Sequence, residues 1–145
     1  MARMQTLMTT KQERDLIETF GERYRISQGA PFAEMERSVI GGDWGANGYT
    51  TMAQADELGE LAELSPGRVL LDLGGGGGWP GLYLAATTGC SVVVTDLSEV
   101  GLRVAATRAN REGLRGRFGA VVASGRRQPF KQRSFDAVIH TDVLC

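Results

Sequence analysis

The stretch Val69–Gly81, VLLDLGGGGGWPG, decides the fold because a short apolar strand runs directly into five consecutive glycines. Glycine loses more backbone entropy on folding than any other residue, so such a run does not belong inside a helix or strand. At the end of a strand, the same glycines let the backbone turn sharply and let a ligand approach the main chain. Ligands of open parallel sheets settle at the carboxyl ends of the strands. We therefore expect a ligand-binding loop at residues 74–78.

A second apolar stretch, Ser91–Asp96, ends on a carboxylate 20 positions after Gly76. Its three consecutive valines are typical of a parallel strand that is buried on both faces. The two oxygens of the Asp96 carboxylate are suited to accept hydrogen bonds from both hydroxyls of a ribose. Together, the glycine loop and Asp96 predict a ligand that contains a nucleoside. They do not decide which nucleoside it is.

Strands and helices alternate along the rest of the chain. We expect strands at residues 68–73, 91–96, 118–123 and 135–140, and helices at 11–28, 51–64, 79–88 and 98–112. Thr51 and Ser98 are the expected N-caps of two helices. This order predicts an α/β fold, a Rossmann-like open parallel sheet with helices on both faces, preceded by N-terminal helices. We divide the chain into an N-terminal helical or lid segment, 1–50, and a sheet domain, 51–145.

Composition limits the partners of this 145-residue chain. Its 42% of hydrophobic residues suffice for a buried core, and its net charge of −1 provides no basic surface for nucleic acid or an anionic membrane. Cys90 and Cys145 are far apart and there is one histidine, so we expect no metal site. No apolar run approaches the roughly 20 residues of a membrane helix. We therefore expect a cytoplasmic protein that acts on a small molecule, without nucleic acid or membrane as partner.

Two ligand classes compete for the glycine loop. Gly76, Gly78 and Gly81 satisfy the G-x-G-x-x-G pattern of dinucleotide-binding proteins, which predicts NAD and an oxidoreductase. However, Asp72, Gly74, Gly76 and Gly78 also fit an acidic-x-Gly-x-Gly-x-Gly pattern. VVVTDLS at 92–98 and SGRRQPFKQRSFDAVIHTDVLC at 124–145 follow it in order. This succession resembles the motifs of class I S-adenosylmethionine-dependent methyltransferases of the small bacterial type, so we favour that family.

The resemblance implies S-adenosylmethionine as cofactor and gives the glycine-loop residues their roles. Asp72, Gly74 and Gly76 would surround its methionine end, and Gly78 would open the following helix. Asp72 has an alternative role as an acceptor for backbone N–H groups at the strand end. Asp96 would hold the ribose hydroxyls.

At the adenine and sulfonium ends, the resemblance implies further contacts. Leu97 would lie against the adenine, and Ser124 stands where the family often has an aspartate that binds the adenine amino group. The Gly125 amide is the second candidate for that contact. His140 and Thr141 would line the floor below the sulfonium. His140 is a weak candidate for a general base, and no other catalytic residue is predicted.

The segment GGDWGANGYTTMAQADEL, residues 41–58, resembles the region ahead of the first motif in small bacterial methyltransferases. The resemblance implies a lid over the cofactor, with Trp44 and Tyr49 facing the pocket. The alternative is a glycine-rich linker that carries two packed aromatic side chains.

Class I methyltransferases have seven strands, whereas the sequence predicts four strands before Cys145. We therefore expect a sheet that is truncated after its fourth strand. A fragment, a truncated gene product and an oligomer that completes the sheet in trans would each explain this, and we favour a fragment that is inactive or weakly active alone. An uncovered fourth strand is a pairing liability, so we also expect self-association through that sheet edge. A module that binds S-adenosylmethionine without turnover remains an alternative. The sequence does not name the methyl acceptor.

Overall fold

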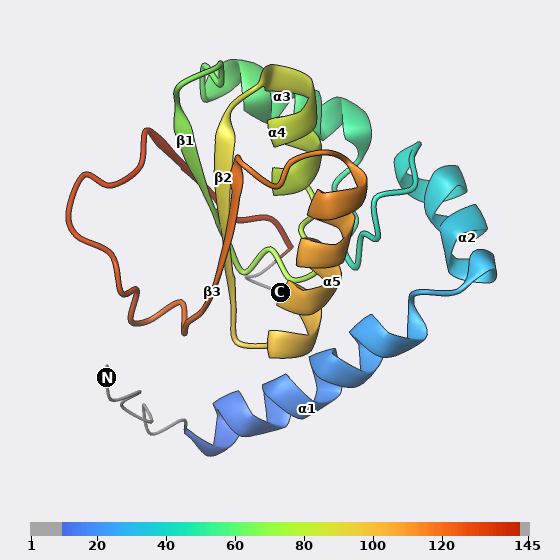
Figure 1. Ribbon diagram of the computed structural model, residues 1–145. Helices are drawn as coiled ribbons and strands as arrows, with labels where there is room; N and C mark the ends of the chain where they lie inside the picture. The colour runs from blue at the N-terminus through green and yellow to red at the C-terminus, as the bar shows by residue number, and fades with distance from the viewer. Residues whose placement is uncertain (1–9, 143–145) are drawn as a thin grey trace.

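The computed structural model describes residues 10–142, so the predicted apolar end Val143–Cys145 lies outside the described residues. Its core is a four-stranded parallel sheet with the strand order β3-β2-β1-β4 (Figure 1). In chain order the elements are α1 (Lys11–Ile26), α2 (Ala30–Ile40), α3 (Met52–Leu61), β1 (Val69–Leu73), α4 (Gly81–Thr88), β2 (Ser91–Asp96), α5 (Glu99–Arg111), β3 (Phe118–Val122) and β4 (Ala137–Ile139).

All four predicted strands are present, and β2 has the predicted bounds. Both predicted N-caps are also confirmed, because Thr51 Oγ1 accepts the Gln54 N–H at 3.2 Å and Ser98 Oγ accepts the Gly101 N–H at 3.3 Å. A hydroxyl at this position satisfies a backbone donor that has no partner within the helix.

Helix α2 was not predicted from the sequence. This helix begins after Gly29, has a proline in its first turn and ends at Gly41, whose φ of 90° is left-handed. Of its large apolar side chains, Ile40 is buried, whereas Phe32, Met35 and Val39 are exposed. The helix therefore lacks the one-sided burial that makes an amphipathic pattern easy to recognise.

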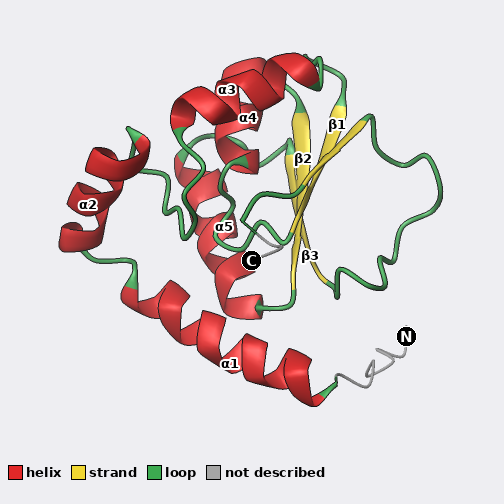
Figure 2. Cartoon of the chain, turned by 180° about the vertical axis from the view of Figure 1, so that it is seen from behind, coloured by secondary structure: helices red, strands yellow, loops and turns green. Residues whose placement is uncertain are grey.

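Helices α3, α4 and α5 lie on one face of the sheet, and no helix of the described residues covers the other face (Figures 1 and 2). The open parallel sheet is as predicted, but the predicted helices on both faces are found on one. Crossovers that step in the same direction, β1 to β2 to β3, place their helices on the same face. The reverse connection from β3 to β4, residues 123–136, is a loop and brings no helix with it.

The core lies between the sheet and these helices. It contains fully buried side chains of β1 and β2, Leu70, Val92 and Val94, packed with Leu82 of α4 and Ala105 of α5. Helix α1 crosses the end of the molecule where β2 ends and α5 begins (Figure 1). Within residues 10–142, no helix has both the length and the apolar character needed to cross a membrane.

Candidate cofactor site

The glycine loop, residues 74–78, turns sharply away from β1 and folds back over the end of β2. The amides of Gly74 and Gly75 both donate to the carbonyl of Thr95, at 2.7 and 3.1 Å. Gly74, Gly76 and Gly78 have φ values of 73°, 49° and 98°, in the left-handed region that side chains disfavour. A Cβ at Gly78 would lie 2.5 Å from Leu82. Backbone conformation and tight packing therefore both require glycine here.

Asp96 and the glycine loop are in direct contact. Its Oδ2 accepts the Gly76 N–H at 3.0 Å, and its Oδ1 accepts the Ser98 N–H at 2.8 Å. Burial raises the pKa of Asp96, while the backbone amides of Ser98, Gly76 and Leu97 oppose that rise. Each carboxylate oxygen can accept more than one hydrogen bond, so Asp96 keeps acceptor capacity for a ligand.

Asp72 lies beneath the loop and is 0% exposed. Its Oδ2 accepts the Gly81 N–H at 2.9 Å, at the start of α4, whereas its Oδ1 is buried without a hydrogen-bond partner. A Cβ at Gly75 or Gly81 would lie within 2.6 Å of this carboxyl group. Burial raises the pKa of Asp72 to about 7; the Gly81 N–H opposes the rise and the charge of Asp96 adds to it. Asp72 thus has the geometry of the strand-end acceptor, and its unpartnered oxygen remains available to a donor.

Tyr24 of α1 covers the glycine loop, a role that the sequence did not indicate. Its side chain is buried, and a Cβ at Gly76 would overlap its hydroxyl. On the other side, the ring meets Gly101 of α5, where a Cβ would lie 2.8 Å from Tyr24 Cε2. Burial raises the pKa of Tyr24, and the Asp96 charge raises it further. The loop is therefore enclosed by α1 as well as by α5.

The end of β3 carries the predicted adenine contacts, and α1 reaches it as well. Ser124 Oγ donates to Glu13 Oε1 at 2.7 Å. This bond is the main cause of a lowered pKa of Glu13, followed by the bond from the Thr10 N–H. Leu97 is half-buried, and Gly125 is exposed with open space where a Cβ would be. A carboxylate therefore lies beside Ser124, supplied by a distant part of the chain.

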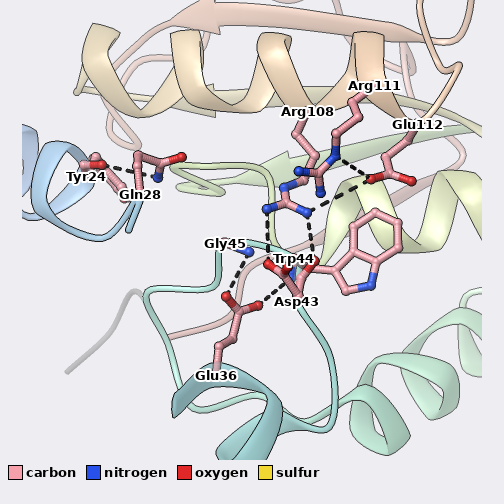
Figure 3. A network of polar contacts seen from close by, with 9 residues as sticks. All are labelled: Tyr24, Gln28, Glu36, Asp43, Trp44, Gly45, Arg108, Arg111 and Glu112. Carbon is pink, nitrogen blue, oxygen red and sulfur yellow. Dashed lines mark hydrogen bonds and ion pairs between the residues drawn. The ribbon is translucent and has the colours of Figure 1, made fainter. Parts of the chain in front are cut away.

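Residues 41–50, the first part of the predicted lid segment 41–58, pack against the glycine loop. The carbonyl oxygen of Gly45 lies 3.3 Å from the Cβ position of Gly77. Trp44 packs edge-on against Tyr83 of α4, with ring centroids 5.3 Å apart. Figure 3 shows that Trp44 also belongs to a polar network around Arg108.

Tyr49 was predicted to face the pocket, but its side chain is 81% exposed. Its backbone N–H donates to Asp142 Oδ2 at 3.0 Å, as do the amide and hydroxyl of Thr50 at 3.2 and 3.0 Å. Asp142, three residues after β4, thus holds the backbone here, and the Tyr49 ring lies in solvent. In this arrangement Tyr49 does not contact the glycine loop, so its place among the cofactor residues remains a prediction.

His140 and Thr141 follow β4, on the opposite side of β1 from β2. The His140 side chain is exposed and makes no hydrogen bond or ion pair with another described residue, and Thr141 is half-buried. Among residues 10–142, no group of three acidic, histidine or cysteine side chains is arranged to hold a metal ion. The carboxyl ends of the strands thus bring together the glycine loop, Asp96 and Ser124, and His140 lies at the end of the edge strand β4.

Comparisons with known proteins place this geometry in a family. A model described as "Methyltransferase domain" matches residues 70–145, which is more than half of the chain. "Squalene methyltransferase 1" of Botryococcus braunii is 33% identical over 94 residues, covering 65% of this chain and 25% of that protein. The chain therefore spans about a quarter of the length of this curated relative.

Solved structures give the same fold. Geranyl diphosphate C-methyltransferase from Streptomyces coelicolor, in complex with S-adenosylhomocysteine, superposes with a TM-score of 0.68 over 91% of this chain and 54% of its own, at 19% identity. The [4+2]-cyclase SpnF superposes with a TM-score of 0.55 at 26% identity, over 81% of this chain and 46% of its own. The family match decides against the NAD alternative. The chain belongs to the methyltransferase-domain family, as a class I S-adenosylmethionine-dependent methyltransferase domain.

Proposed function

We propose that the chain binds S-adenosylmethionine beside the glycine loop and Asp96 and transfers its methyl group to a small-molecule acceptor. The observation that carries this proposal is the contact between the Asp96 carboxylate and the Gly76 amide, at the carboxyl ends of β1 and β2. This contact supports the proposal because a carboxylate that can accept hydrogen bonds from two ribose hydroxyls lies beside a main chain without side chains. Residues 10–50 of the proposed lid segment, 1–50, would close the site from one side, and the sheet domain, 51–145, would form its floor.

Two further parts of the proposal rest on residues near the ends of this site. Asp72 Oδ1 has no hydrogen-bond partner among the described residues, and we assign it to the cofactor's ammonium group, which would reach this buried oxygen only after the glycine loop above it moves. At the proposed adenine end, Gly125 is exposed and directly follows Ser124, and Leu97 is half-buried. The Glu13 carboxylate on Ser124 restores the negative charge that the serine itself lacks.

Methyl transfer needs alignment more than acid–base chemistry, since S-adenosylmethionine supplies a methyl group on a sulfonium that is already activated. When bound, the cofactor would supply the methyl group and be left as the neutral thioether S-adenosylhomocysteine. The residues around the glycine loop would exclude water and hold the methyl group in line with the acceptor. A base is required only for an acceptor that arrives protonated, and His140 at the end of β4 is the exposed candidate for it.

We propose a small apolar molecule as the acceptor class. The support is the name of the relative that is 33% identical, a squalene methyltransferase. In this proposal residues 72–125 contribute the nucleoside half of the site, and His140 and Thr141 are the described residues assigned to the side of the methyl group.

Calorimetric titration with S-adenosylhomocysteine tests the cofactor part of the proposal, with NAD as the control ligand. We expect the wild-type chain to bind S-adenosylhomocysteine and not NAD, and Asp96→Ala to bind at least about tenfold more weakly, as expected for lost hydrogen bonds to a charged group. Asp15→Ala, an exposed aspartate on α1, is the matched control and should leave the affinity unchanged. Equal affinities of the wild type and Asp96→Ala would refute the assigned ribose contact.

A second candidate function is cofactor binding without methyl transfer. The observation that favours it is the similarity to SpnF, a protein of this fold that is named as a [4+2]-cyclase. A single-turnover experiment with radiolabelled S-adenosylmethionine and a set of sterol and linear isoprenoid acceptors separates the two functions. Label transferred to any acceptor identifies an enzyme, whereas bound but untransferred label across the set favours the binding module.

A further inference from the structure

The strongest unassigned feature is a polar network that clamps residues 43–45 between α2 and α5 (Figure 3). From α2, the Glu36 carboxylate accepts the backbone N–H of Trp44 through Oε1 and that of Gly45 through Oε2, the latter at 3.0 Å. A carboxylate that accepts two consecutive amides fixes the path of the backbone between them.

Arg108 of α5 holds the same residues from the opposite side. Its Nη1 donates to the carbonyl oxygen of Asp43 at 2.7 Å, and its Nη2 lies 3.5 Å from Asp43 Oδ1. Its guanidinium carbon lies 5.9 Å from the centroid of the Trp44 ring, within the range of a cation–π interaction. The side chain is only 10% exposed, and Glu112 one turn later lies 4.0 Å from Nη1. Arginine suits this place because its planar fork bonds and stacks at the same time.

The residues held by this network, 43–45, lie against the glycine loop. Gly45 has a φ of 71°, and its carbonyl oxygen lies 3.3 Å from the Cβ position of Gly77. The same Gly77 position lies 3.6 Å from Val104 Cγ1, and Val104 precedes Arg108 by one turn on the same face of α5. One helix face therefore contacts the glycine loop directly and, through Arg108, holds the segment that covers it.

We propose that Arg108 is a positioning residue, which holds Asp43–Gly45 against the glycine loop and thereby sets the affinity for the cofactor. This inference rests on the proposed function, because it assigns Arg108 a role in the site where S-adenosylmethionine would bind. Arg108 itself would not touch the cofactor. Its effect passes through the position of the Gly45 carbonyl over Gly77.

The test compares Arg108→Gln with Arg103→Gln, which removes the same charge from the same helix at an exposed position paired with Glu99, outside the network. We expect Arg108→Gln to weaken S-adenosylhomocysteine binding about fivefold or more, a usual size for coupling between a ligand site and a remote contact, and Arg103→Gln to leave it unchanged. Arg108→Lys should not restore affinity, because the compact ammonium group of lysine cannot both donate to Asp43 and stack on the Trp44 ring.

A second readout needs no ligand. Hydrogen exchange of the Trp44 and Gly45 amides should become faster in Arg108→Gln, and faster still in Glu36→Ala, while Glu34→Ala on the same helix is the control. If the wild type does not bind S-adenosylhomocysteine, the proposed function fails, and the exchange rates still test the clamp. If the wild type binds and Arg108→Gln binds equally well, or exchanges at the wild-type rate, the positioning role of Arg108 is overturned.

Discussion

The carboxyl group of Asp72 has no contact with water and one hydrogen-bond donor, the Gly81 amide, so its ionisation is costly. Burial raises the pKa of Asp72 from 3.8 to about 7. Between these two pH values, the folded chain keeps a proton that the unfolded chain has lost. The free energy of unfolding therefore falls as pH rises through this window, by about 4 kcal/mol for Asp72 alone, as an order of magnitude.

Asp72→Asn tests this linkage, because asparagine keeps an acceptor for the Gly81 amide and cannot ionise. We expect the stability of the variant relative to the wild type to increase steadily from about pH 4 to about pH 7 and to level off above it. Urea unfolding at a series of pH values measures the difference. Asp96 is present in both proteins, so the comparison isolates Asp72. Parallel stability curves for the two proteins would contradict a buried, protonated Asp72.

At the scale of elements, Tyr24 is the large buried side chain of α1, and it packs between the glycine loop and α5. Tyr24→Ala removes the ring between the glycine loop and Gly101, and a large-to-small change at a buried aromatic typically costs about 3–5 kcal/mol. We expect faster hydrogen exchange across Lys11–Ile26 and an unfolding free energy lowered by at least about 2 kcal/mol. Ile26→Ala, an exposed position on the same helix, is the control. Unchanged exchange in Tyr24→Ala would show that α1 docks by other contacts.

Elements whose signal is local could be predicted from the sequence. The valine run of β2, the capping residues Thr51 and Ser98, and the glycine loop each depend on neighbours within a few residues. Helix α2 was missed because most of its large apolar side chains are exposed. A periodic apolar pattern arises where one face of a helix is buried, and this helix has no such face.

In the candidate site too, some contacts could be predicted from the sequence and others could not. The proximity of Asp96 to Gly76 follows from the parallel register of β1 and β2, which the sequence predicts. The contacts of Glu13 with Ser124 and of Arg108 with Asp43 join residues 111 and 65 positions apart, and no local pattern reports such pairs. Tyr24 lies within the helix predicted at residues 11–28, but its contact with the glycine loop was not predictable from periodicity alone.

For the molecule as a whole, long-range contacts, two of them polar and one of packing, tie residues 10–50 to three of the strand ends. Glu13 bonds Ser124 after β3, Tyr24 covers the loop after β1, and Asp142 after β4 bonds the amides of Tyr49 and Thr50. Closure over the carboxyl ends is thus distributed across α1 and the 41–50 segment. A ligand that enters between them would displace or use these contacts, so we expect ligand binding to be coupled to the order of residues 10–50.

The described sheet also has two edges, and β4 forms one of them with its second backbone side unpaired within residues 10–142. The side chain of Val138 on this strand is 57% exposed, on a short parallel edge that carries no charge of its own. Such an edge is a template for pairing with another chain. We expect the 145-residue chain to self-associate as its concentration rises, observed as an increasing average mass in light scattering.

Val138→Lys should reduce this association, because a lysine on an edge strand opposes pairing between chains. Met35→Lys adds the same charge at an exposed apolar position of α2, away from the sheet, and should leave the association unchanged. Equal suppression by both variants would assign the effect to net charge rather than to the β4 edge. A monomeric wild-type chain at all concentrations would show that this edge is protected in solution.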